Sequence, residues 1–241
     1  MPHKTLTTLF MIFILLFTAG CDTATAARKH YYIFVDRSAS VTPAQRAHWK
    51  AATSNVFDAV ERGDSISVYP LHANTLAAAA AFSGTSRSID DGAPHEEVEQ
   101  ANVEFEAMVK GAYVGLNRLL SDSEPSIETD IFSFVDRLPS NPGSGHIVVI
   151  VLSDMLHSSS RDIDFERTAI KPADFQALLQ RIADQHHWHP GVLADTAVTC
   201  VLPPLDGKVR REINDRRVLK DFWGALVQAL GGRLNGFDTQ I

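Results

Sequence analysis

The stretch YYIFVDRSASV, residues 31–41, decides the fold class of this chain. Its first half is a run of aromatic and β-branched residues, which is typical of a buried β-strand. The run ends on a carboxylate, Asp36, and two hydroxyls follow at alternate positions, Ser38 and Ser40. Ligands of parallel α/β sheets bind beyond the carboxyl ends of the strands, so these three residues are candidate ligand-binding residues.

Strands and helices alternate along the rest of the chain. Strands are expected over residues 30–35, 65–71, 147–152 and within 192–205. Residues 74–82 are expected to form an edge strand, although their alanines fit a helix equally well. Helices are expected over residues 43–61, 96–120, 130–138, 172–185 and 217–230. This alternation predicts a doubly wound α/β domain with a mostly parallel central sheet, one antiparallel edge strand and helices on both faces.

A second acid follows the clearest strand of the sequence. Residues 147–152 are continuously apolar and largely β-branched, as expected of a strand that is buried on both faces, and Asp154 lies just beyond them. If this strand neighbours the first one, Asp36 and Asp154 project into the same crevice. Thr129 is expected to open the helix over residues 130–138.

These residues together resemble the metal-ion-dependent adhesion site of the von Willebrand factor type A domain. The matching residues are Asp36, Ser38 and Ser40 in DRSAS, Thr129 in ETDI, and Asp154 in VLSDM. The resemblance implies a bound Mg²⁺, with Mn²⁺ or Ca²⁺ as alternatives. It also implies that the serines ligate the ion directly and the aspartates directly or through water, while Thr129 joins and leaves the site as it switches. Hydroxyl and carboxylate oxygens are the ligands that Mg²⁺ prefers.

The same resemblance implies a protein partner, because in this family a partner's Asp or Glu fills the vacant position on the metal. The function expected from it is therefore metal-dependent protein binding, and the protein is not expected to be an enzyme. The sequence departs from the family at two positions. Met155 follows Asp154 where Gly is common, and Glu128 precedes Thr129 where Gly is frequent.

The N-terminal residues have the pattern of an export signal. Lys4 precedes an apolar run over residues 6–17, which is too short for a comfortable membrane span, and small residues lead to Cys21. Thr18-Ala19-Gly20-Cys21 resembles the lipobox of bacterial lipoproteins, which implies cleavage before Cys21 and lipidation of its thiol. An ordinary cleaved signal and an N-terminal anchor helix are the alternatives. The expected organisation is a signal peptide at 1–20, a tether at 21–29 and the domain at 30–241.

This organisation predicts a lipid-anchored protein of the bacterial cell envelope. In enterobacterial-type lipoproteins Asp22 would resemble a signal for retention in the inner membrane, facing the periplasm; otherwise the outer membrane or the cell surface is expected. The net charge of −7 gives no basic footprint for nucleic acid. Beside Cys21, only Cys200 remains, within an apolar run, so we expect a core cysteine and no disulfide.

Two other functions stay open at this level. A hydrolase could use the metal as a Lewis acid with His157 as the general base. An aspartyl phosphatase would need a carboxylate at the position of Ser38. A serine hydrolase is poorly supported, because the sequence has no G-x-S-x-G motif. A structural module with a degenerate site is the other possibility. The HHWH tract over residues 186–189 is interpreted as a polar helix end rather than as a zinc site.

Overall fold

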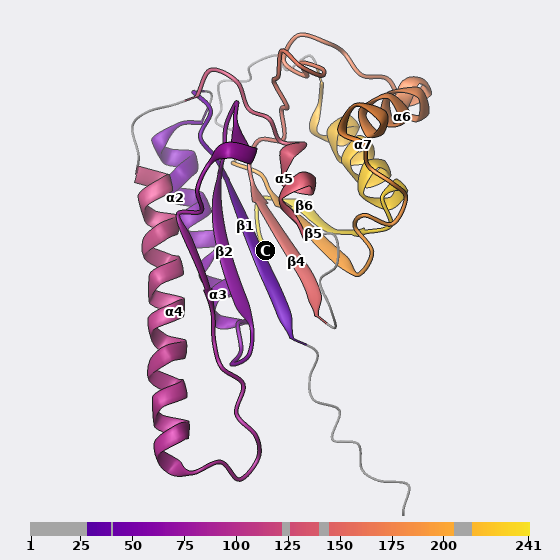
Figure 1. Cartoon of the computed structure of the whole chain (residues 1–241). Coiled ribbons are helices and arrows are strands. Elements are labelled where there is room, and N and C mark those ends of the chain that lie inside the picture. The colour runs from indigo at the N-terminus through magenta and orange to yellow at the C-terminus, as the bar shows by residue number, and fades with distance from the viewer. Residues whose placement is uncertain (1–27, 40, 122–125, 140–144, 205–213) are drawn as a thin grey trace, which may run out of the picture.

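A six-stranded sheet forms the centre of the molecule (Figure 1). The computed structural model describes residues 28–39, 41–121, 126–139, 145–204 and 214–241. The strands are β1 (Lys29–Asp36), β2 (Ser65–Leu71), β3 (Phe82–Thr85), β4 (His146–Leu152), β5 (Thr196–Val201) and β6 (Arg233–Asp238). Their order across the sheet is β3-β2-β1-β4-β5-β6, and only β3 runs antiparallel to its neighbour. The predicted fold class is therefore confirmed.

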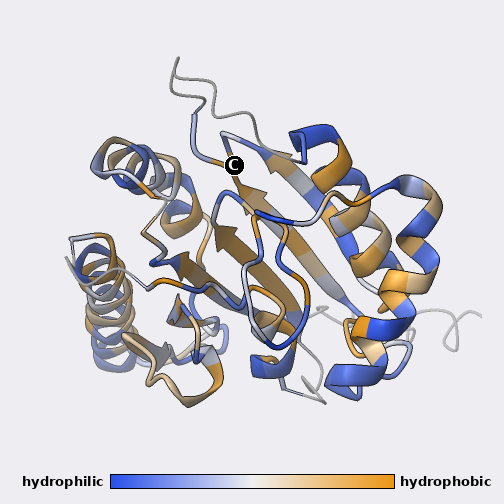
Figure 2. Ribbon diagram, turned by 90° about the horizontal axis from the view of Figure 1, so that it is seen from above, coloured by the Kyte–Doolittle hydropathy of each residue, from blue (hydrophilic) through white to orange (hydrophobic). Residues whose placement is uncertain are grey.

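Helices cover both faces of this sheet (Figures 1 and 2). They are α2 (Pro43–Ala52), α3 (Ser54–Asp58), α4 (His95–Ser121), α5 (Ser133–Arg137), α6 (Phe175–His186) and α7 (Arg216–Ala229), with 3-10 turns η1 (Thr75–Ala77) and η2 (Pro172–Asp174). Within the parts of the chain that are described, no helix combines the length and apolarity needed to cross a membrane.

Successive side chains of β1 point to opposite faces of the sheet and pack in two hydrophobic cores. Ile33 and Val35 pack in one core with Trp49 of α2 and residues of α3 and α4. Phe34 points to the opposite face and packs in the other core with residues of α5, α6 and α7. Because both faces of the central strands are covered, those strands are apolar along most of their length, whereas the helices carry polar residues on their outer sides (Figure 2). Cys200 lies in the second core as a free thiol, as expected, and burial raises its pKa.

Several element boundaries differ from the prediction. The helix expected over residues 43–61 is interrupted at Thr53, whose hydroxyl donates to the carbonyl oxygens of Trp49 and Lys50 and so competes with the helical backbone. The antiparallel edge strand begins at Phe82 rather than at residue 74, and the segment before it contains η1.

The long helix α4 runs without a break through Gly111 and Gly115. Both glycines face Phe82 of β3, and a Cβ atom at Gly115 would lie 2.9 Å from Phe82 Cβ. These glycines therefore allow close contact between helix and strand. The edge strand β6 was not predicted at all; Arg233–Asp238 reads RLNGFD, which lacks a strong strand signal.

The chain order places a switch point between β1 and β4. From β1 the chain proceeds to β2 and β3 on one side of the sheet and then returns to β4 on the other side. Val35 of β1 is paired with Leu152 of β4, so the two strands end side by side. Ligands of open α/β sheets bind at such a point, beyond the carboxyl ends of the strands.

Candidate functional site

The carboxylate of Asp36 is the centre of the candidate site. It ends β1, its residue is only 2% exposed, and three segments of the chain donate hydrogen bonds to it. The backbone N–H of Ser38 donates to Oδ1 at 2.7 Å, and the Thr129 hydroxyl donates to the same oxygen at 3.4 Å. The Ser153 hydroxyl donates to Oδ2 at 2.6 Å. The Ser38 side chain also hydrogen-bonds this carboxylate.

Burial dominates the electrostatics of this carboxylate. Desolvation raises the pKa of Asp36, and the hydrogen bonds from Ser153, Ser38 and Thr129 offset only part of that rise. The neutral hydrogen-bond donors alone therefore do not fully offset the cost of burying the ionised Asp36 carboxylate. A bound cation would supply the missing positive charge and favour the ionised carboxylate, so the donor set fits a hard divalent ion chemically.

A β-bridge, and not the start of a helix, positions Thr129 beside Asp36. Its N–H donates to the Ser158 carbonyl oxygen at 2.8 Å, and the Ser158 N–H donates back to the Thr129 carbonyl at 3.0 Å. The prediction that Thr129 opens a helix is wrong, because α5 begins at Ser133 with Phe132 in the N-cap position. The hydroxyl was nevertheless correctly expected near Asp36, since the bridge positions the same residue.

Asp154 lies in the loop that follows β4, and its Oδ1 accepts the N–H of Leu156 at 3.0 Å. The next residue, Met155, has a left-handed backbone with φ of 63°, the conformation that Gly adopts at least cost. Its buried side chain packs in the core. This packing explains how Met155 is accommodated at a position where the family that the sequence resembles commonly has Gly.

The structure therefore brings the side chains of Asp36, Ser38 and Thr129 together, and it places Asp154 two residues beyond the adjacent strand. Ser40 and Cys21 lie outside the described residues. Metal binding by this set stays a prediction. Sequence reasoning missed Ser153, whose hydroxyl also accepts the Met155 N–H at 2.9 Å; its position directly after a buried strand was the available signal.

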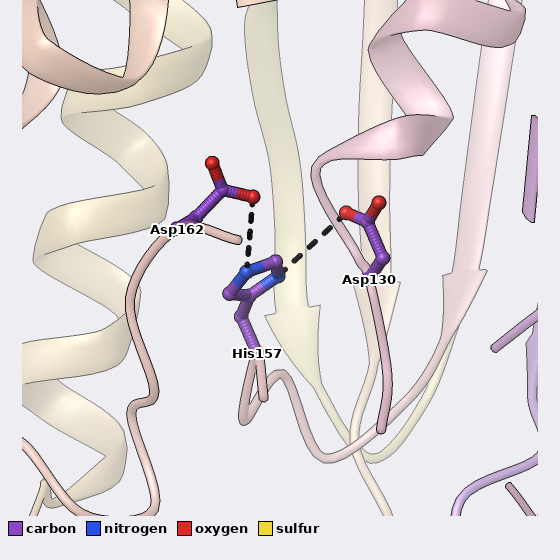
Figure 3. Close-up of side chains that lie close together, drawn as sticks. All are labelled: Asp130, His157 and Asp162. Atoms are coloured by element: carbon purple, nitrogen blue, oxygen red, sulfur yellow. Dashed lines mark ion pairs between the residues drawn. The ribbon is translucent and has the colours of Figure 1, made fainter. Parts of the chain in front are cut away.

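A second group of titratable side chains lies nearby in the fold (Figure 3). One possible ligand atom each of Asp130, His157 and Asp162 falls within 4.8 Å of the others. His157 is fully buried, and its Nδ1 accepts the N–H of Ile131 at 3.1 Å. Its Nε2 has no hydrogen-bond partner among the described residues and lies 3.7 Å from Oδ2 of Asp162.

His186, at the end of α6, extends this group. Its Nδ1 lies 2.8 Å from Oδ2 of Asp136, and its Nε2 lies 3.4 Å from Oδ2 of Asp162. The indole N–H of Trp188 donates to the other oxygen of Asp136. His186 ends α6, as the interpretation of the 186–189 tract as a polar helix end requires, but its acidic partners were not predicted. The acids were not recognised because they are distant in sequence.

The two histidines have opposite pKa shifts. Burial, and then the charge of His186, lower the pKa of His157 to about 3. Burial also acts to lower the pKa of His186, but the hydrogen bond to the Asp136 carboxylate and the charges of Asp136, Asp162 and Asp130 outweigh it, so the pKa is raised. His157 also packs on the Phe132 ring, with centroids 4.1 Å apart. A buried imidazole with this pKa is poorly suited to take a proton from a substrate.

The chain has structural neighbours among known proteins. No family model matches the chain, and no curated protein matches it. Among solved structures, the chain is similar to a von Willebrand factor type A protein from Catenulispora acidiphila, at 16% identity and a TM-score of 0.43. The likeness covers 88% of this chain and 39% of that chain. The α/β fold class rests on the sheet order itself.

Proposed function

We propose that this protein is a lipid-anchored binding module that recognises a partner protein through a divalent metal at Asp36. The observation that carries the proposal is the meeting of the Ser38 and Thr129 side chains on one buried carboxylate at the switch point of the sheet. Mg²⁺ is the ion we propose, with Mn²⁺ or Ca²⁺ as alternatives, since every donor in the set is a hard oxygen.

The proposed ligand set is Asp36, Ser38, Ser40, Thr129 and Asp154. The hydroxyls would bind the ion directly, and Asp36 and Asp154 would bind it directly or hold its water molecules. When bound, the metal supplies an electrophilic position for a carboxylate from the partner. Ser153 would hold Asp36 in place, because its hydroxyl lies 2.6 Å from Oδ2 and is itself fixed by the Met155 N–H.

Exposed apolar side chains beside this site support a protein partner. Ile127, two residues before Thr129, is 93% exposed, and Leu76 of η1 is 48% exposed. The two loops are joined, since the Ala73 N–H donates to the Ser126 hydroxyl at 3.3 Å. These exposed side chains would add apolar contact area beside the metal in a complex with a partner protein.

The described chain enters β1 at the end opposite to the proposed site. The chain enters the sheet at Lys29 and reaches Asp36 at the far end of the strand, which has 8 residues. At about 3.3 Å per residue, the strand separates the two by roughly 23–26 Å. We propose the inner membrane, facing the periplasm, if Asp22 acts as a retention signal, and otherwise the outer membrane or the cell surface.

A metal-dependent hydrolase is the alternative function, and its weak point is the general base. His157 was the candidate, and its ring is fully buried with its Nδ1 occupied by the Ile131 N–H. The proposal is therefore a binding protein rather than an enzyme.

Titration calorimetry with Mg²⁺ and Mn²⁺ tests the metal site. We expect one saturable binding event in the wild type and its loss in Ser38→Ala and Thr129→Ala. Ser160→Ala is the matched control, because Ser160 is an exposed hydroxyl in the neighbouring loop outside the proposed ligand set. Acetate should then displace water from bound Mn²⁺ and lower the relaxation enhancement of water protons. Absence of saturable heat in the wild type would refute the proposal.

A further inference from the structure

We propose that His157, Asp162 and His186 form a second metal site, for a transition ion of the Zn²⁺ class. The three residues come from the loop after β4 and from the end of α6, and they are not part of the ligand set around Asp36. Two imidazoles and one carboxylate form a nitrogen-and-oxygen donor set that suits Zn²⁺, whereas Mg²⁺ prefers oxygen ligands alone. The inference does not depend on the proposed binding function.

Two of the distances between the proposed donor atoms are close to those of such a site. Oδ2 of Asp162 lies 3.7 Å from Nε2 of His157 and 3.4 Å from Nε2 of His186. In a tetrahedral site with bonds of about 2.0–2.1 Å, neighbouring ligand atoms are about 3.3 Å apart. On binding, the contact between His157 and Asp162 would shorten by a few tenths of an ångström. At present that Nε2 is buried and has no hydrogen-bond partner in the described part of the chain.

Each imidazole also has a carboxylate on its other side. Nδ1 of His186 lies 2.8 Å from Oδ2 of Asp136, and Nδ1 of His157 lies 4.0 Å from Oδ1 of Asp130. Histidines that bind metal usually donate their second N–H to such a group, which fixes the ring and strengthens the ligand. The Trp188 indole N–H in turn holds Asp136. His186 thus has a carboxylate partner on its far side, whereas Nδ1 of His157 accepts the Ile131 N–H and lies beyond hydrogen-bond distance of Asp130.

Charge balance favours a cation in this group. Asp130, Asp136 and Asp162 are three acids, and within the described residues their basic ion-pair partners are His157 and His186. Three acids therefore face two imidazoles in a largely buried setting, where unpaired charge is costly. A divalent ion would supply the missing charge.

Metal binding requires a change of tautomer at His157. Its Nδ1 now accepts the Ile131 N–H, which leaves the proton of a neutral ring on Nε2. An ion at Nε2 would displace that proton, and Nδ1 would then carry the proton and donate it toward Asp130. The Ile131 N–H would lose its acceptor. This exchange gives the proposal a spectroscopic signature that is independent of any substitution.

Zn²⁺ titration of the full-length chain in detergent tests the proposal. Excess Mg²⁺ is present throughout, so that the all-oxygen site does not contribute, and Co²⁺ serves as a coloured substitute for Zn²⁺. We expect one equivalent of Zn²⁺ in the wild type, with Co²⁺ absorption bands typical of a site with four or five ligands. The equivalent should be lost in Asp162→Asn and His186→Gln and retained in His189→Gln, an exposed histidine in the same tract.

Asp136→Asn should weaken Zn²⁺ binding by about 10–100-fold, because it removes only the support of His186. In the wild type, nitrogen-15 spectra should show His157 changing from the Nε2–H to the Nδ1–H tautomer as Zn²⁺ is added. Circular dichroism identifies any variant that fails to fold, and the wild-type spectra then decide alone. The proposal is overturned if the wild type binds no equivalent, if folded Asp162→Asn and His186→Gln bind as the wild type does, or if the His157 tautomer does not change.

Discussion

Acidification should destabilise this protein through His157. Its pKa is lowered from 6.5 to about 3 in the folded chain, mainly by burial. In the unfolded chain the ring is solvated and titrates near its ordinary value. The unfolded state therefore binds the proton first as the pH falls. The stability contributed by the neutral ring is complete above pH 6.5 and is lost progressively as the pH falls toward 3.

The size of the effect follows from the two pKa values. A difference between 6.5 and about 3 corresponds to about 5 kcal/mol in full, of which about 3 kcal/mol is lost between pH 7 and pH 4. The imidazole is completely buried against the Phe132 ring, so solvent does not screen this cost. The raised pKa of His186 acts in the opposite direction, since its contribution to stability grows as the pH falls.

Urea unfolding at pH 7 and pH 4 in the presence of a chelator measures the effect, with His157→Gln as the reference. Gln stays neutral, and its amide oxygen can accept the Ile131 N–H. Both proteins retain His186, so the comparison isolates His157. The wild type should lose about 3 kcal/mol more than His157→Gln between the two pH values. Equal losses in the two proteins would refute the reasoning and indicate that His157 is protonated or solvated in the folded chain.

Three further predictions follow from the packing and from the sequence. Ser153→Ala should cost about 1–3 kcal/mol in urea unfolding, because it leaves Oδ2 of Asp36 without this donor. Gly115→Ala should lower the melting temperature, because the new Cβ would lie 2.9 Å from Phe82 Cβ. The cost of this overpacking, about 1–3 kcal/mol, outweighs the gain in helix propensity of about 1 kcal/mol. Cys21→Ala should abolish palmitate labelling and release the protein from the membrane fraction.

The outcomes that would contradict these predictions are equally specific. Wild-type stability in Ser153→Ala would mean that Asp36 does not depend on that hydroxyl. A higher melting temperature for Gly115→Ala would mean that Phe82 moves aside at little cost. Membrane attachment of Cys21→Ala would favour the alternative of an uncleaved N-terminal anchor helix.

The central strands were predictable because burial on both faces gives them a continuous apolar pattern. Residues 65–71 were bounded correctly, and 147–152 missed β4 by one residue at its start. Edge elements gave weaker signals. β6 pairs on one side only and contains a glycine, and β3 has 4 residues, so neither has a long run of buried residues. The interruption at Thr53 depends on side-chain hydrogen bonds to the backbone, which periodicity does not reveal.

The candidate site was predictable only where a local pattern or a strand end marked it. Asp36 and Ser38 follow a recognisable strand, and Thr129 was expected near them for the wrong structural reason, because a β-bridge and not a helix cap places it. The group around His157 has no such local pattern in the sequence. Asp130, Asp162 and His186 come from separate segments, and only the tertiary fold brings them to one buried histidine.

Diffraction from crystals grown with Mn²⁺ would show whether a metal binds beside Asp36, because the anomalous signal locates the ion without any assumption about its ligands. We expect an anomalous peak at the switch point of the sheet, within bonding distance of the Ser38 and Thr129 hydroxyls and beside Asp36. A structure in which Asp36 keeps its hydrogen bonds to Ser153 and Thr129, with no peak beside it at saturating Mn²⁺, would refute metal binding at this site.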